Sequence, residues 1–186
     1  MRVRNLLLPV DGFCMSGEIA PLFIRWSLPH WAALGVVALA AGGLLWGCRR
    51  LRMEKRVLIG KALGAVFLLT FLIETFGRIV REHWEPWQDR LPLHFCSLMT
   101  LVCFIALWFR KPWACAVAYF GVLTASVQGL ITPMLYDGFP SAAFFAFFVG
   151  HGLLLISALY LPVVLGWRAR PWDCLLYTSP SPRDGL

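Results

Sequence analysis

The chain has 186 residues, of which 59% are hydrophobic and 15% are charged, and its formal net charge is +7. A soluble domain of this length needs a more polar surface, so the composition excludes an ordinary water-soluble globular protein. The positive charge does not call for a nucleic-acid partner, because basic loops beside anionic lipids account for it. We therefore expect membrane lipids as partners and no nucleic acid.

Residues 1–28 form an N-terminal segment ahead of the first long apolar run. Its opening, MRVRNLLLPVDGFC, has a basic start, but its apolar stretch is shorter than the core of a signal peptide. Met15 is an alternative start, in which case residues 1–14 are not native.

Five mostly apolar runs follow, each long enough to cross a bilayer core of about 30 Å as a helix. The runs are continuously apolar, whereas the strands of membrane barrels are shorter and alternate. The sequence therefore predicts an all-α, polytopic transmembrane helix bundle that occupies residues 29–172. The runs cover residues 29–48, 57–76, 91–109, 112–133 and 141–167.

Prolines mark the ends of the predicted helices. Pro29, Pro92 and Pro112 fall near helix starts, where a missing N–H costs little, and Pro133 falls just past a helix end. Pro162 lies inside the fifth run, and the sequence leaves open whether it kinks the helix or stops it early.

The distribution of Lys and Arg between the loops predicts the orientation. The basic residues concentrate in 48–56, in 110–111 and in 168–170, which all fall on one side of the membrane, while the loop 136–140 has none. We expect a multi-pass protein of the cell membrane with that basic side in the cytoplasm and the N-terminus outside.

Residues 174–184, CLLYTSPSPRD, differ in composition from the sequence before them. They match the translation of a sequencing-adapter read-through, so residues 174–186 are expected not to be native. On this interpretation the natural protein continues, with at least one more helix.

Cysteines are scattered along the chain. Five precede residue 174, and none form a CxxC pair. An odd, scattered set argues against a disulfide framework and against a structural zinc site, and we expect no metal and no cofactor.

Polar side chains at membrane depth are rare, costly and tend to face the bundle interior. With the predicted orientation they all fall in the outer half of the membrane, which predicts an outward-opening polar pocket floored by His151 and flanked by Gly150 and Gly152. The alternative is a purely structural role, with histidines bonding between helices and Glu74 paired with Arg78. The candidate binding residues are Glu74, His94, Gln128 and His30.

Four short motifs, in this order, resemble the YwaF-type bacterial integral membrane proteins. They are LPLHFC (91–96), AYFGVLTASVQGLITP (118–133), GFP (138–140) and FFVGHG (147–152). More remotely the chain resembles multi-pass lipid enzymes, including a membrane acyltransferase and the androgen-induced fatty-acid ester hydrolases. That likeness implies an intramembrane nucleophile with a histidine.

An intramembrane lipid hydrolase or acyltransferase would use His151 as general base and Cys96 or Ser97 as nucleophile. Helical geometry favours Ser97, because it shares a face with His94, whereas the resemblance favours Cys96. Gln128 could then donate to an oxyanion. A proton-coupled or small-solute transporter, a haem-binding electron carrier and a non-catalytic membrane assembly protein remain alternatives.

Overall fold

The computed structural model describes residues 22–81 and 95–169, and this part of the chain is all-helical, which confirms the predicted fold class. The helices are α1 (Leu28–Arg49), α2 (Met53–Arg81), α4 (Phe95–Phe109), α5 (Pro112–Gly121), the π-helical turn η1 (Val122–Ser126), α6 (Val127–Ile131) and α7 (Ala142–Val163).

Four stretches of helix are long and apolar enough to cross a membrane. One of them is the continuous rod formed by α5, η1 and α6. The remaining predicted helix, 91–109, corresponds to α4, which is apolar throughout its 15 described residues. The four stretches are Leu28–Arg49, Met53–Ile73, Pro112–Ile131 and Ala142–Val163.

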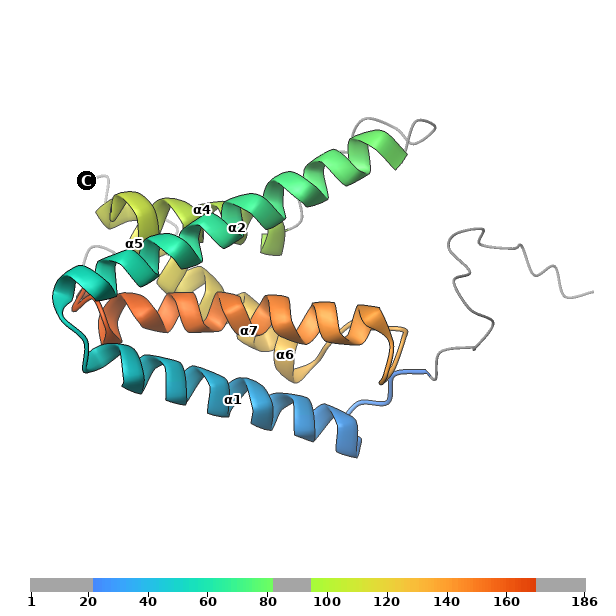
Figure 1. Ribbon diagram of the computed structural model, residues 1–186. Helices are drawn as coiled ribbons and strands as arrows, with labels where there is room; N and C mark the ends of the chain where they lie inside the picture. The colour runs from blue at the N-terminus through green and yellow to red at the C-terminus, as the bar shows by residue number, and fades with distance from the viewer. Residues whose placement is uncertain (1–21, 82–94, 170–186) are drawn as a thin grey trace, which may run out of the picture.

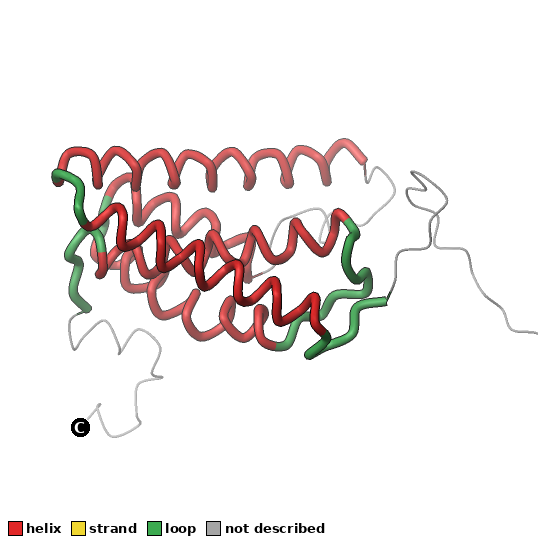
Figure 2. The backbone as a smooth tube through the Cα atoms, turned by 60° about the horizontal axis from the view of Figure 1, so that its bottom comes forward, coloured by secondary structure: helices red, strands yellow, loops and turns green. Residues whose placement is uncertain are grey.

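α7 is the central helix of the bundle. It packs against α1 on one side and against α4 and the α5–η1–α6 rod on the others (Figure 1). α2 lies mainly on α4, and the second view shows the helices running side by side along one common direction (Figure 2). Only 17% of the apolar windows of α1 and α2 is buried, against 39% for α7 and 44% for the rod. The outer helices therefore present apolar side chains to their surroundings, as expected for contact with lipid.

The helix starts follow the local sequence. α1 carries Pro29 in its first turn, and α5 begins at Pro112, so neither helix loses a hydrogen bond to the missing N–H. α7 has a side-chain cap, because the Ser141 Oγ accepts a hydrogen bond of 3.1 Å from the Phe144 N–H.

Pro162 stops α7 instead of kinking it. The helix ends one residue later, at Val163. The chain then reverses at Gly166, whose φ of 73° is in the left-handed region, and the Trp167 N–H donates to the Leu161 carbonyl.

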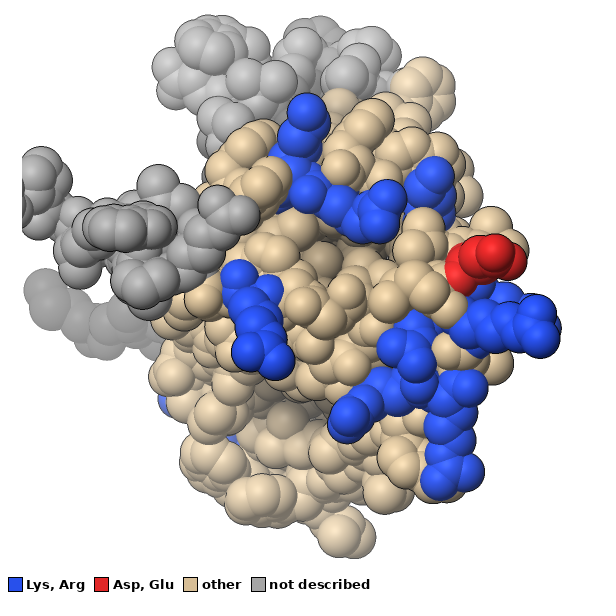
Figure 3. Space-filling model, turned by 90° about the vertical axis from the view of Figure 1, so that its left-hand side faces the viewer, with Lys and Arg blue, Asp and Glu red and all other residues tan. Residues whose placement is uncertain are grey.

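One end of the bundle is strongly basic (Figure 3). The turn between α1 and α2, the turn between α4 and α5, and the segment after α7 all meet there. We call this the basic end. Trp46 lies at the same end, where the Arg50 guanidinium stacks 3.6 Å from its ring centroid. The cationic residues of the basic end are Arg49, Arg50, Arg52, Lys55, Arg56, Arg110, Lys111 and Arg168.

Arg56 ties three segments of the basic end together. Its Nε donates to the Leu51 carbonyl at 2.9 Å, its Nη1 donates to the Val164 carbonyl at 3.3 Å, and its Nη2 donates to the Arg49 carbonyl. The Arg56 carbonyl in turn accepts a 2.7 Å hydrogen bond from the Tyr160 hydroxyl. The three carbonyls that accept from the Arg56 guanidinium lie at or just past the ends of α1 and α7, where no intrahelical donor is left.

We predict that Arg56→Met lowers the free energy of unfolding by about 2 kcal/mol, because it leaves charge-assisted hydrogen bonds to backbone carbonyls unmade. Thermal unfolding in detergent checks this. The matched control is Arg52→Met, which removes the same side chain from an exposed position four residues earlier. Equal melting temperatures for the two variants would contradict the assignment.

Candidate active site

His151 is held on α7 by the turn before it. Its Nδ1 lies 3.0 Å from the Phe147 carbonyl oxygen, and its ring stacks on the Phe147 ring with centroids 4.1 Å apart. A carbonyl oxygen can only accept, so Nδ1 carries the proton in a neutral ring. That leaves Nε2 as an unprotonated acceptor.

Cys96 meets this free nitrogen. Its Sγ lies 3.5 Å from the His151 Nε2, although the two residues are 55 positions apart in the chain. A sulfur donor reaches an acceptor at this separation, and here the thiol is the partner with a proton to donate. Both side chains are half-buried. The arrangement has a nucleophile, a base and a carbonyl that orients the base, which are the three parts of a nucleophilic catalytic unit.

The pair lies deep in the bundle. His151 is ten residues from Ser141, or about 15 Å along the axis, and about 18 Å from the other end of α7. Cys96 lies about 20 Å from the basic end of α4. The two side chains are therefore at matching distances from the basic end, near the middle of α7 and at the described start of α4.

Gly129 of α6 forms the wall beside the imidazole. A Cβ at this position would lie 3.2 Å from the His151 Cδ2 and 3.3 Å from Nε2. Such contacts are tighter than van der Waals packing normally allows, so a larger residue would displace the ring. Glycine is what lets α6 approach the ring edge that faces Cys96.

Ser97, the other candidate nucleophile, is buried on α4. The Thr100 hydroxyl donates to the carbonyls of Cys96 and Ser97, at 3.0 and 2.8 Å, which fixes the backbone at this turn. Of the two candidates, the one in contact with His151 is Cys96. The catalytic roles of these residues stay predictions.

His30 and Gln128 lie apart from the Cys96–His151 pair. His30 is fully buried and bonded at both ring nitrogens, to the Trp26 N–H and to the Leu130 carbonyl, each at 3.0 Å. Gln128 is exposed on α6, and its amide donates to the Thr132 hydroxyl at 3.2 Å. These hydrogen bonds place neither His30 nor Gln128 at the Cys96 thiol.

Two further candidates fall outside what the structure describes. His94 is among residues 82–94, and the Glu74 side chain is likewise not described. Within residues 22–81 and 95–169, no three His, Cys, Asp or Glu side chains gather closely enough to hold a metal ion.

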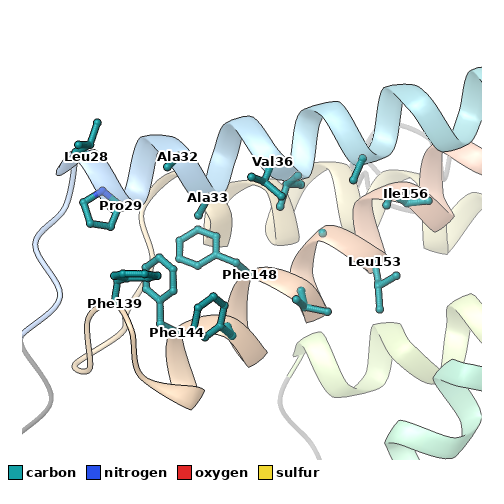
Figure 4. Close-up of a pocket in the computed structure, with 15 residues that line it drawn as sticks. Leu28, Pro29, Ala32, Ala33, Val36, Phe139, Phe144, Phe148, Leu153 and Ile156 are labelled. Atoms are coloured by element: carbon teal, nitrogen blue, oxygen red, sulfur yellow. The ribbon is translucent and has the colours of Figure 1, made fainter. Parts of the chain in front are cut away.

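A groove of about 510 Å³ runs between α1 and α7 on another face of α7 (Figure 4). Side chains from both helices and from Phe139 point into it, and all of them are apolar. The volume lies in the range of small-molecule pockets, about 300–1,000 Å³. None of the predicted catalytic or binding residues lines it, although Gly152 does, so this hollow is distinct from the Cys96–His151 pair.

Two residues of the site escaped the sequence analysis. Gly129 has no chemistry of its own, and the carbonyl of Phe147 is invisible in a list of side chains. A histidine four residues after an aromatic residue on a predicted helix is the signal that could have pointed to Phe147, because side chains at i and i+4 share a face.

Comparison with known proteins assigns the chain at family level. The profile of the TMEM164 family matches residues 25–178. The chain belongs to the TMEM164 family. No curated protein and no solved structure gives a significant match.

Membership of the TMEM164 family agrees with the apolar helices, and the chain is a multi-pass membrane protein. The family match spans the whole described bundle, including both Cys96 and His151. The narrower resemblance to YwaF-type bacterial proteins stays a prediction, as does the origin of residues 174–186.

We predict that a membrane-permeant haloacetamide alkylates Cys96 before the other described cysteines. Cys48, Cys103 and Cys115 are buried, whereas Cys96 is half-buried with its thiol against an imidazole that can accept its proton. Thiolate is the reactive species, so His151→Phe should slow alkylation of Cys96 about tenfold at neutral pH.

Site-resolved mass spectrometry after timed alkylation provides the measurement. Cys103 serves as the internal reference, because it is buried in the core and lies away from His151 along α4. Alkylation of Cys103 at the rate of Cys96 would contradict the prediction.

Proposed function

We propose that this protein is an intramembrane acyl-transfer enzyme that acts on lipid acyl esters through a thioester at Cys96. The observation that carries the proposal is the contact of the Cys96 thiol with the His151 Nε2, whose proton-accepting state is set by the bond from Nδ1 to the Phe147 carbonyl. Cysteine with histidine as base is a recurrent nucleophilic pair.

In the first half-reaction, Nε2 of His151 takes the thiol proton while Sγ attacks the carbonyl carbon of the acyl ester. The bond between that carbon and the ester oxygen breaks, and the lipid alcohol leaves with the proton from Nε2. Cys96 then carries the acyl group as a thioester.

In the second half-reaction, a hydroxyl acceptor gives its proton to Nε2 and attacks the thioester carbon. The carbon–sulfur bond breaks, and Sγ regains the proton. Water as acceptor makes the reaction a hydrolysis, and a lipid hydroxyl makes it a transfer. The Phe147 carbonyl stabilises the transient imidazolium, because it accepts from Nδ1 throughout.

The lipid substrate is supported by the depth of the pair. The thiol contacts His151 near the middle of the apolar helix α7, about 15 Å along its axis from Ser141, where molecules from the bilayer are nearer at hand than solutes from water. A site closed to water would protect the thioester and favour transfer to a lipid hydroxyl over hydrolysis.

The experiment uses proteoliposomes that contain a phospholipid with a labelled acyl chain. We expect a labelled protein adduct that hydroxylamine releases, as a thioester requires. Cys96→Ala should abolish the adduct and Ser97→Ala should leave it, while His151→Ala should slow its formation by about 10²- to 10⁴-fold, the usual contribution of a general base. An adduct that survives Cys96→Ala and is lost in Ser97→Ala would overturn the assignment.

We also propose that the basic end faces the cytoplasm of a cell membrane, which follows from the preference of short basic loops for that side. The test places single cysteines at exposed positions, Tyr136→Cys and Lys111→Cys, in a background where all six cysteines of the sequence are serines. We expect an impermeant maleimide to label position 136 in intact cells and position 111 only after permeabilisation. The reverse pattern would invert the orientation.

A further inference from the structure

His30 lies at the start of α1 in a fully buried site packed with aromatic rings. The ring centroids of Phe23, Trp26 and Phe148 lie 5.4, 5.4 and 5.7 Å from that of the imidazole. The backbone N–H of Trp26 donates to the His30 Nδ1, so the proton of the neutral imidazole is on Nε2. Nε2 therefore donates to the Leu130 carbonyl, 100 residues further along the chain.

The Leu130 carbonyl needs this donor. It lies one residue before the end of α6, among the carbonyls that have no partner within the helix. α6 is the last segment of the continuous rod and ends just before Pro133, so no following helical turn supplies donors to its carbonyls. The bond from His30 anchors α6 to α1 from outside.

The residue before Leu130 is Gly129, which lies so near the His151 edge facing the thiol that a Cβ there would be 3.2 Å from Cδ2. His151 is thus bordered on three sides, by the stacked Phe147 ring, by the Phe147 carbonyl and by α6 at Gly129. The first two supports belong to α7 itself. The third depends on where α6 lies.

We infer that His30 is a positioning residue for the Cys96–His151 pair. Through the Leu130 carbonyl it holds Gly129 against the imidazole and so sets the separation of Nε2 from Sγ. The effect of His30 on catalysis rests on the proposed function. Its effect on the distance between the His151 Nε2 and the Cys96 Sγ does not.

Two substitutions separate the two bonds of His30. In His30→Gln the side-chain amide reaches the place of Nε2 and can still donate to Leu130, whereas the acceptor for Trp26 is lost. In His30→Asn the amide oxygen lies near the place of Nδ1 and can still accept from Trp26, whereas the donor to Leu130 is lost. Each variant removes one bond from the same buried site, so each is the control for the other.

The readout is the rate of Cys96 alkylation relative to Cys103, with the melting temperature measured in parallel. We expect His30→Gln to stay near the wild-type rate and His30→Asn to be slower by about tenfold or more, since misplacement of a reacting group by 1 Å can cost about 10²-fold. Gly129→Ala, which leaves both bonds of His30 intact, should change the Cys96 rate by a similar factor without a matching loss of stability.

Wild-type rates in both His30 variants would overturn the inference. So would equal slowing with equal loss of melting temperature, because that result assigns His30 to the fold as a whole. Alkylation needs no acyl substrate, so it is independent of the thioester experiment. Absence of a thioester in the wild type refutes the proposed function, while the alkylation rates still decide whether His30 positions the pair.

Discussion

Carbonyl groups that have lost their helical partners are the constraint on which this bundle depends. Where water is excluded, a donor for such a carbonyl must come from the protein. Arg56 supplies donors where α1 and α7 end, and His30 supplies one where α6 ends. His151 also donates from its Nδ1 to a backbone carbonyl, that of Phe147 inside α7. The bonds that close the fold at both ends are thus chemically the same as the bond that orients the candidate base.

The helices and most of their boundaries could be predicted from the sequence, because hydrophobic length and proline position act locally. The exception is α2, which spans Met53–Arg81 where the apolar run predicted 57–76, because the helix continues through charged residues at both ends. The pairing of helices could not be predicted in this way. Cys96 and Ser97 differ by about 100° around α4, and which of them meets α7 depends on how α4 is rotated against α2. No local sequence pattern predicts how α4 is rotated about its own axis.

The contacts of His30 and Gly152 likewise could not be predicted from the local sequence. The sequence predicts only a polar residue at a helix start for His30. In the structure Trp26 adopts a positive φ of 63°, and its backbone N–H donates to the His30 ring. Of the two glycines beside His151, Gly152 lies against Val37 of α1, where a Cβ would be 3.1 Å from a methyl group, while Gly150 faces open space. Only Gly152 therefore allows a neighbouring helix to approach closely.

The π-helical turn η1 explains why Gly129, and not Gln128, lies against the imidazole. Such a turn acts as a one-residue insertion into an α-helix, so everything after it is out of phase by about 100°. In an uninterrupted helix continued from α5, position 128 would occupy the angular place that Gly129 takes here. The π-turn therefore decides which side chain the rod turns toward α7: if 122–126 became regular α-helix with every residue kept, an amide would replace the glycine at the wall of the site.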